Sequence, residues 1–479
     1  MKRINKKNTY FFLLLIIGSM VLSGCTKPGN EIVPTRTPNI GEISLSETKQ
    51  AEETQIITQT HVPTQDSFMN IDLNLLYGTE IKFIYPWTGK IDLTLQALIN
   101  EFNKQNEWGI IMTGISIGGA EPMFELLNEQ SLAGDMPDLI ILNPYLIKRL
   151  EGENYWTDLS NYINDQVWGL GQDRLAEIPE VYFKQSQVGS NIYGFPVSLS
   201  ATGLFYNITW AQEMGFKSPP ETQEELVEQL CKAAESKLSD DDIDNNGTGG
   251  MLLSRTPLSI LSWYQSFGGN IPDGVETTQF NDQSGSSAFS FVKSLFDDSC
   301  AWVGRQPTPY DYFANRYTLI YEGKLEDILL QTDAFSRNQN TDEWIMLPYP
   351  TQSGQGSFVV DAYSLAVPVS KPETQLAAWL FIRWFTSNAT QIIFIQSSGS
   401  WPVYQPTMKS MVDFQTSYPQ WDDLIPFSGL VSAAPSYSGW LLDKMVLEDA
   451  YWRYLQADAD TLPDILELLD ATILELSEE

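Results

Sequence analysis

The sequence predicts an α/β fold, with mostly parallel strands and flanking helices divided between two domains. The chain has 479 residues, 43% of them hydrophobic, which is enough for two domains with their own cores. Strand-like and helix-like segments alternate from Glu80 onward. The stretch Gly194–Asn207 is apolar at both ends and hydroxylated in the middle, which fits an extended crossing between domains better than a core strand. An ordinary strand and loop is the competing interpretation.

The N-terminus has the pattern of a bacterial lipoprotein signal. Four basic side chains among the first seven residues precede an apolar run, Phe11–Leu22, that is too short for an ordinary membrane span. Leu-Ser-Gly then precedes Cys25, as in a lipobox, where the cysteine is diacylated and becomes the mature N-terminus. We therefore expect residues 1–24 to be removed and Cys25 to anchor the chain outside the cytoplasm. A soluble secreted protein with a chance cysteine is the alternative.

Residues 25–74 are expected to form a flexible tether. Thr26–Asn70 is rich in Thr, Pro, Glu, Gln and Ser and has too few apolar side chains to order itself. Such a coil spans roughly 35–40 Å on average, so an anchored domain could stand off the membrane. The only histidine, His61, lies in this tether, which excludes a histidine-based metal site or catalytic triad in the folded part. We expect no metal and no cofactor.

Charge and cysteine content limit the partners. The 28 basic and 61 acidic residues give a net charge of −33, so we expect no binding to nucleic acid. Cys231 and Cys300 remain after processing, and an extracytoplasmic chain permits a disulfide between them. Two buried free thiols are the competing interpretation.

The alternation begins with five segments. Glu80–Pro86 is β-prone and stops at proline, and apolar side chains from Leu93 to Phe102 recur at helical spacing. Trp108–Ile117 is predicted as a strand, Glu121–Leu132 as a helix and Pro137–Leu142 as a strand. Ligands of such sheets bind at the carboxyl ends of the strands. Trp87 and the turn that begins at Asn143 are therefore placed where a ligand would lie.

Five motifs follow one another along the chain, at Glu101–Asn106, Ala133–Asp138, Tyr193–Pro196, Phe205–Asn207 and Pro219–Leu226. No single motif is specific, but their serial order over nearly the whole mature chain is. That order resembles the family 1 extracellular solute-binding proteins of carbohydrate ABC transporters, which include maltose-binding protein.

The resemblance continues to the C-terminus with two departures. A helix is expected from Gln279 to Leu295, and Tyr321–Lys324 matches a family phrase, although Leu325-Glu326 replaces the usual Ala-Met. Val359–Val367 resembles a strand that often follows paired glycines, which are missing here while Asp361 stands nearby. That puts a backbone contact to sugar in doubt. Ala377–Phe385, the turn near Trp401 and a helical C-terminus after Pro435 fit the closing pattern.

The resemblance implies a two-lobed, type II periplasmic-binding-protein fold. Each lobe would be a mixed sheet flanked by helices, and a hinge of several segments would join them. Chain crossings are expected at Gly194–Asn207, at Trp344–Pro348 and near Gly399. The expected lobes are residues 75–197 plus 349–398 and residues 198–348 plus 399–479.

Asp242–Gly247 partly resembles a calcium loop. Asp242, Asp244, Asn246 and Gly247 fit the first half of the pattern, but Leu253 stands where the bidentate glutamate belongs. We interpret the segment as a polar surface turn, and calcium binding remains the alternative.

A monomeric receptor for a sugar or oligosaccharide, which would deliver it to an ABC permease, is the expected function. Aromatic rings cover the C–H face of a sugar, while carboxylates, amides and hydroxyls pair with its rim. A receptor for a polyamine or other cation is an alternative, and a surface glycoside hydrolase is a weaker one. The predicted ligand-binding residues are Trp87, Glu121, Asn143, Ser198, Ser200, Thr202, Trp263, Tyr264, Tyr312, Glu322, Asp361, Tyr363, Trp401 and Trp440.

Overall fold

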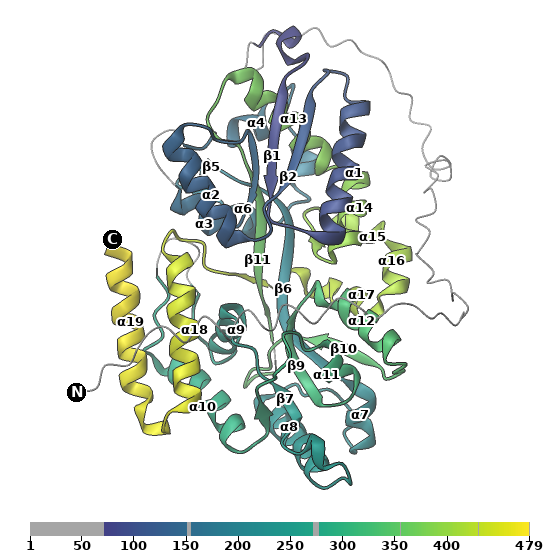
Figure 1. Cartoon of the computed structure of the whole chain (residues 1–479), viewed down its shortest axis with the longest axis vertical. Coiled ribbons are helices and arrows are strands. Elements are labelled where there is room, and N and C mark those ends of the chain that lie inside the picture. Colours follow the sequence, from purple (N-terminus) through teal and green to yellow (C-terminus); the bar gives the residue numbers. More distant parts are fainter. Residues whose placement is uncertain (1–70, 151–154, 272–276, 355, 430, 479) are drawn as a thin grey trace, which may run out of the picture. The chain divides into compact units, whose positions relative to one another are not determined.

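The computed structural model describes residues 71–150, 155–271, 277–354, 356–429 and 431–478, all within the compact unit Pro63–Glu479 (Figure 1). The predicted signal peptide, Cys25 and residues 25–70 of the predicted tether lie outside the described residues. Regular structure begins before the expected tether boundary at residue 74, because Leu73–Leu76 form the 3-10 helix η1, which Asp72 caps and which buries Leu76. Among the described residues, no helix is both long and apolar enough to cross a bilayer.

Among the residues that the structure describes, eleven strands form one mixed sheet. Its order is β2-β1-β3-β11-β6-β9-β7-β8, with β10 and β12 also paired to β6 and β13 paired to β11. The strands are β1 (Glu80–Tyr85), β2 (Ile111–Ser116), β3 (Leu139–Leu142), β6 (Phe195–Asn207), β7 (Gly249–Leu252), β8 (Ala301–Trp302), β9 (Thr318–Lys324), β10 (Trp344–Leu347), β11 (Phe358–Ala366), β12 (Trp401–Pro402) and β13 (Val431–Ala433). A separate hairpin pairs β4 (Gln187–Val188) with β5 (Asn191–Ile192).

Helices flank the sheet. α18 packs against α9, α10 and α19, and α19 also packs against α10. Those of ten or more residues are α1 (Gly89–Gln105), α2 (Ala120–Ala133), α8 (Gln223–Leu238), α9 (Pro257–Ser266), α10 (Gln283–Asp297), α12 (Asp327–Arg337), α13 (Pro372–Phe385), α14 (Asn388–Ser398), α18 (Trp440–Gln456) and α19 (Leu462–Glu478). The shorter ones are α3 (Pro144–Arg149), α4 (Ser160–Asn164), α5 (Gln172–Leu175), α6 (Glu180–Lys184), α7 (Ile208–Glu213), α11 (Tyr310–Ala314), α15 (Gln405–Lys409), α16 (Val412–Ser417) and α17 (Pro419–Asp422).

The parallel strands at the two ends of the sheet point toward each other. β1, β2 and β3 are parallel to one another, as are β7, β8 and β9. Between these groups, β11 runs antiparallel to β3 and β6, and β6 runs antiparallel to β9. Leu142 at the end of β3 pairs in register with Ser364 of β11, and Ser364 pairs in turn with Pro196 of β6. Lys324 at the end of β9 pairs in register with Thr202 of β6. Both sets of carboxyl ends therefore face the middle of β6.

Gly194–Asn207 was expected to be a crossing and not a core strand. The crossing is observed, but the exclusion of a core strand is wrong. Figure 1 shows β6 and β11 running from the part with β1 and β2 to the part with β7 and β9. All 13 residues of β6 are also buried, because β9, β10, β11 and β12 pair with it. Phe195, Val197 and Leu199 face one hydrophobic core, while Leu204 and Tyr206 face the other. The segment is thus a crossing and a core strand at once.

Gly203 marks the tightest point of β6. A Cβ atom there would lie 2.7 Å from the Leu347 carbonyl oxygen and 2.7 Å from the Phe358 ring, so a larger residue would push β10 away. Beside it the rings of Phe205 and Tyr321 stack with centroids 4.4 Å apart.

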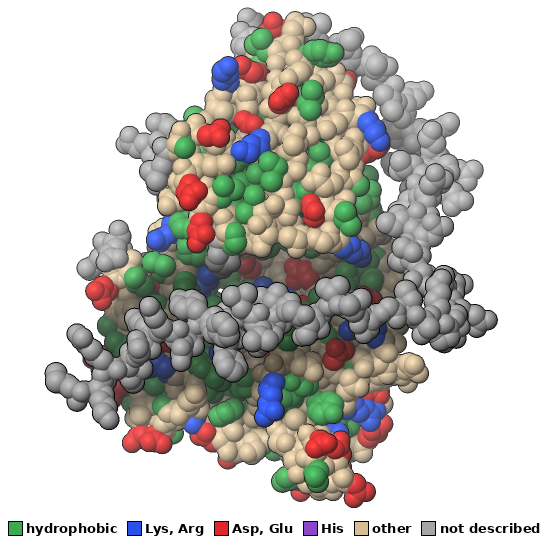
Figure 2. Space-filling model, in the orientation of Figure 1, with side chains coloured by type: hydrophobic (Ala, Val, Ile, Leu, Met, Phe, Trp, Pro, Cys, Tyr) green, Lys and Arg blue, Asp and Glu red, His purple; other side chains and the backbone are tan. Residues whose placement is uncertain are grey.

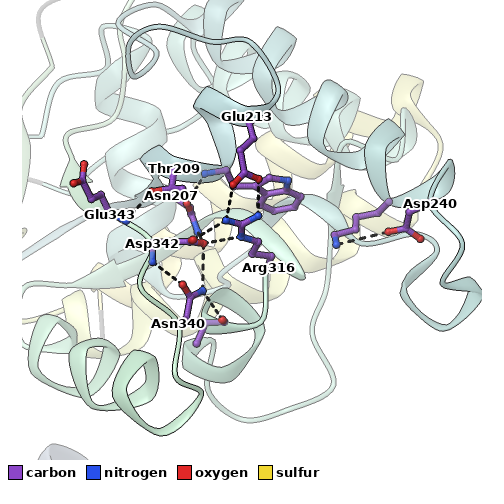
Figure 3. A network of polar contacts seen from close by, with 11 residues as sticks. Asn207, Thr209, Glu213, Asp240, Arg316, Asn340, Asp342 and Glu343 are labelled. Carbon is purple, nitrogen blue, oxygen red and sulfur yellow. Dashed lines mark hydrogen bonds and ion pairs between the residues drawn. The ribbon is translucent and has the colours of Figure 1, made fainter.

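A polar network fastens the far end of β6 to β10 (Figure 3). Arg316 Nη1 lies 2.6 Å from Glu213 Oε2, and Arg316 Nη2 lies 2.6 Å from Asp342 Oδ1. Asn207, the last residue of β6, donates from Nδ2 to Asp342 Oδ2 at 2.8 Å. Burial alone would raise the pKa of Asp342, but hydrogen bonds from Arg316 and Asn207 outweigh it and lower the pKa. The network therefore stabilises the charged carboxylate.

The predicted mixed α/β fold is confirmed, and the sheets of its two parts are continuous because β6 and β11 run through both. The strands expected at Glu80–Pro86, Pro137–Leu142 and Val359–Val367 are observed as β1, β3 and β11. The possible disulfide is confirmed, since Cys231 on α8 is bonded to Cys300 before β8. The expected lobe boundaries remain a prediction.

Candidate functional site

Three hydroxyl side chains lie on β6 between the two sets of strand ends. Ser198, Ser200 and Thr202 alternate along the strand and therefore share one face of the sheet. The Ser200 hydroxyl donates to the Glu326 carboxylate, whereas Thr202 Oγ1 has no partner among the described residues. Figure 2 shows this molecule hollowed across the middle of one face, with acidic, basic and hydrophobic side chains in the hollow.

Asn143 and Asp361 meet beside these hydroxyls. Asn143 follows β3, and its Nδ2 atom donates to Asp361 Oδ2 at 3.0 Å and to the Ala362 carbonyl at 3.3 Å. Asp361 is directly opposite Ser200 in the sheet register. Burial raises the pKa of Asp361, although Lys324, Lys444 and the bond from Asn143 act in the other direction. The site therefore holds a carboxylate whose charge is poorly compensated.

Trp87 and Tyr363 form an aromatic pair at the same edge. Trp87 follows β1, is half-buried and lies edge-on to the Tyr363 ring, with centroids 4.9 Å apart. Its carbonyl accepts from the Ser116 hydroxyl at 2.7 Å, which ties the loop to the end of β2. Because Tyr363 is in register with Ser198, the pair lies next to the hydroxyl row.

A pocket of about 270 Å³ lies at the carboxyl ends of β7, β8 and β9. Its lining includes Ser254, Arg255, Gln306, Tyr321 and Glu322. Such strand ends are the usual ligand position in sheets of this kind.

Glu322 organises the inner wall of this pocket. The carboxylate accepts from Ser254 N at 2.6 Å, Trp263 Nε1 at 2.8 Å and the Tyr349 hydroxyl at 3.1 Å. Burial raises the pKa of Glu322 to about 7, and these three hydrogen bonds oppose the rise. Its oxygens are therefore already engaged, and the residue positions the wall.

Glu326 is a site residue that the sequence analysis missed. It stands at the N-cap position of α12, its carboxylate accepts from the Ser200 hydroxyl, and burial raises its pKa to about 7. The only available signal was its departure from the Ala-Met of the resembled family. The two-residue strand β8 was too short to reveal the neighbouring pocket in advance.

Several predicted ligand-binding rings lie in the core instead of in loops. Trp263 and Tyr264 belong to α9, and Trp440 begins α18. Trp263, Tyr264, Trp401 and Trp440 are 1%, 3%, 0% and 3% exposed. Tertiary packing buries these rings, which argues against ligand contact.

The last two predicted residues are placed differently. The Tyr312 hydroxyl accepts from the backbone amides of Arg305 and Gln306 at 3.0 and 3.1 Å, so it holds the loop after β8. Glu121 lies in α2, and its side chain is outside the described part of the structure.

The Asp242–Gly247 loop uses its own polar atoms internally. Asn245 Nδ2 donates to Asp240 Oδ2 at 2.9 Å, and Asp242 Oδ1 accepts from Asp244 N at 3.1 Å. Across the described ranges, no three histidine, cysteine, aspartate or glutamate side chains are grouped as metal ligands.

Comparison with known families and relatives points to solute binding. A family model described as bacterial extracellular solute-binding protein matches residues 97–418. The multiple sugar-binding protein of Streptococcus mutans is 27% identical over 139 residues, which are 29% of this chain and 30% of that protein. The match thus spans less than a third of that relative.

Two solved structures share the fold. The cyclic alpha-maltosyl-1,6-maltose binding protein from Arthrobacter globiformis has a TM-score of 0.68 and 16% identity, over 83% of this chain and 99% of that chain. An ABC substrate-binding protein from Listeria monocytogenes, in complex with cycloalternan, has a TM-score of 0.68 and 18% identity, over 84% and 99%.

Proposed function

This chain belongs to the bacterial extracellular solute-binding protein family, and on that premise we propose that it binds a sugar or oligosaccharide and delivers it to an ABC permease. The family consists of non-enzymatic receptors, so the glycoside hydrolase alternative is set aside. The lipid on Cys25 would keep the receptor at the membrane, and the predicted tether would give it reach.

One observation carries the proposal. Three hydroxyls, an amide and a carboxylate gather where both sets of strand ends meet, on Ser198, Ser200, Thr202, Asn143 and Asp361. Sugars present a rim of hydroxyls that such groups can pair with, while the Trp87–Tyr363 pair offers an apolar face. The two relatives with solved structures are a cyclic alpha-maltosyl-1,6-maltose binding protein and a protein in complex with cycloalternan, which agrees with this ligand class.

The mechanism follows from the paired strand ends. A ligand that contacts groups from both parts of the sheet favours the conformation in which they are closest, and binding then shifts the population toward it. β6 and β11 join the parts, so we propose that the bending is concentrated in these strands.

A thermal-shift screen tests the sugar proposal. The full chain with Cys25→Ser, which carries no lipid, is heated with cycloalternan and with linear oligosaccharides of increasing length. A ligand at a hundred times its Kd is expected to raise the melting midpoint by about 5 °C. The stabilising sugar should be recovered intact, and failure of all sugars to shift the midpoint would refute the proposal.

A cationic solute is the second candidate. Burial raises the pKa of Glu322, Glu326 and Asp361, so the site keeps carboxylates that an amine could compensate. Spermidine in the same screen separates the two. If spermidine raises the melting midpoint, high salt removes that rise and no sugar raises the midpoint, the result favours the cation receptor.

A further inference from the structure

A second pocket, of about 350 Å³, lies apart from the central site. It is lined by the C-terminal end of α1 and the loop after it, by α5 and by the C-terminal half of α13. The residues that matter for its chemistry are Trp108, Arg174, Arg383, Trp384 and Glu107. None of them lines the pocket beside Glu322.

Two guanidinium groups line this second pocket, and neither has a carboxylate partner among the described residues. Arg174 Nη2 donates to the Thr386 carbonyl at 2.6 Å, and its Cζ atom lies 4.5 Å from the centroid of the Tyr404 ring. Within the described part of the chain, neither arginine forms an ion pair, and Arg383 makes no hydrogen bond. This arrangement is unexpected in a chain with 61 acidic and 28 basic residues.

The electrostatics of Arg383 agree with a missing counter-charge. Burial is the main factor that lowers the pKa of Arg383, and the charge of the neighbouring Arg174 lowers it further. The carboxylate of Asp165 raises it. Glu107 also lines the pocket but forms no ion pair with either guanidinium. A half-buried cation without a partner is costly, and an anion that fits between the two arginines would remove the repulsion.

We propose that this pocket binds a small soluble oxyanion, a carboxylate or phosphate group, between Arg174 and Arg383. The planar guanidinium presents paired donors that match such a group bidentately. The half-buried indole rings of Trp108 and Trp384 form apolar walls that suit the body of an acidic ring compound. This pocket is separate from the proposed sugar-binding site. Its ligand is an anion, whereas the second candidate ligand of the sugar-binding site is a cation.

Melting midpoints of the full chain with Cys25→Ser test the proposal. Inorganic phosphate and glucuronate are added separately, and sodium chloride keeps the ionic strength constant. At a hundredfold excess over Kd, either anion is expected to raise the midpoint by about 5 °C. The anion with the larger shift identifies the preferred group, and equal shifts support a general oxyanion site.

Arg383→Gln supplies the decisive variant. It should abolish the anion-dependent shift and raise the midpoint in chloride, because the repulsion from Arg174 is relieved. Arg337→Gln is the matched control, since Arg337 is exposed and paired with Asp311 at 3.4 Å, and its anion response should equal that of the unaltered protein. An undiminished anion shift in Arg383→Gln would overturn the proposal.

Calorimetry of the chain with both arginines gives an answer that does not depend on the folding of a variant. Binding of one phosphate or glucuronate per chain supports the site, whereas no heat of binding with either at about 10 mM refutes it. Sugar affinity should be the same in Arg383→Gln, since the two pockets share no residue.

Discussion

Asp361 on β11 lies directly opposite Ser200 on β6, and the two side chains share one face of the sheet. Ser200 donates to Glu326, while Asp361 accepts from Asn143. The strand register thus brings two carboxylates, one before α12 and one on β11, beside a single hydroxyl. The central site is acidic because of this pairing.

Asp361→Asn should raise stability and weaken ligand binding. Burial raises the pKa of Asp361, so its stabilising contribution is present only at low pH and is lost as the pH rises through the folded-state pKa. At pH 7 the neutral amide should therefore melt at a higher temperature, while sugar affinity falls at least about tenfold. Calorimetric titration and melting curves measure both. Asp413→Asn, an exposed control, should change neither, and unaltered affinity in Asp361→Asn would remove Asp361 from the site.

Stability should increase as the pH falls from 8 to 5, in part through Glu322. Its folded-state pKa of about 7 exceeds the ordinary value of 4.5, so the folded protein binds the proton more tightly than the unfolded chain. One such group adds about 2 kcal/mol to the free energy of unfolding over this range. Urea unfolding at both pH values should show a correspondingly smaller change in Glu322→Gln. An equal change in both proteins would contradict this assignment.

Arg316→Gln should destabilise the fold by about 3 kcal/mol, because it leaves Asp342 without its ion pair. The Asp342 side chain is only 8% exposed, and it joins the end of β6 to the segment before β10. Arg337→Gln removes an exposed ion pair and should cost less than about 1 kcal/mol. Chemical denaturation measures both. A smaller loss in the double variant Arg316→Gln with Asp342→Asn would identify the unpaired charge as the cause.

Replacing Cys231 and Cys300 together by serine should lower the free energy of unfolding by about 4 kcal/mol. The bond joins residues that are 69 positions apart, and crosslinks of that span restrict the unfolded chain strongly. Denaturation with and without a reducing agent checks this, since the reductant should affect only the parent protein. Sugar affinity should stay the same, because neither cysteine lines the pocket beside Glu322.

The sequence predicted the elements of the fold better than the environment of its side chains. Strands such as Glu80–Tyr85 and the extended Phe195–Asn207 follow from local apolar patterns and turn residues. The burial of Ser200 does not, because it depends on β11 and on Glu326, which are distant in sequence. A bulky residue at Ser200 is therefore expected to lower the melting midpoint as well as ligand affinity.

The candidate site was predictable where strand ends could be recognised. Trp87 and Asn143 follow the first and third strands, and the structure brings them to Tyr363 and Asp361. The burial of Trp263, Trp401 and Trp440 could not be predicted, because an aromatic residue has the same local sequence whether its ring is exposed or packed inside. Only tertiary contacts distinguish the two.

The order of strands along the chain also affects how the protein can be made. β6 is synthesised well before β9, β10 and β11, so it has none of these partners until β9 is made and lacks β11 until Ala366 has left the ribosome. A nascent chain therefore cannot close its sheet during most of translation. This delay suits a polypeptide with the predicted export signal, since export machinery threads chains that have not yet folded.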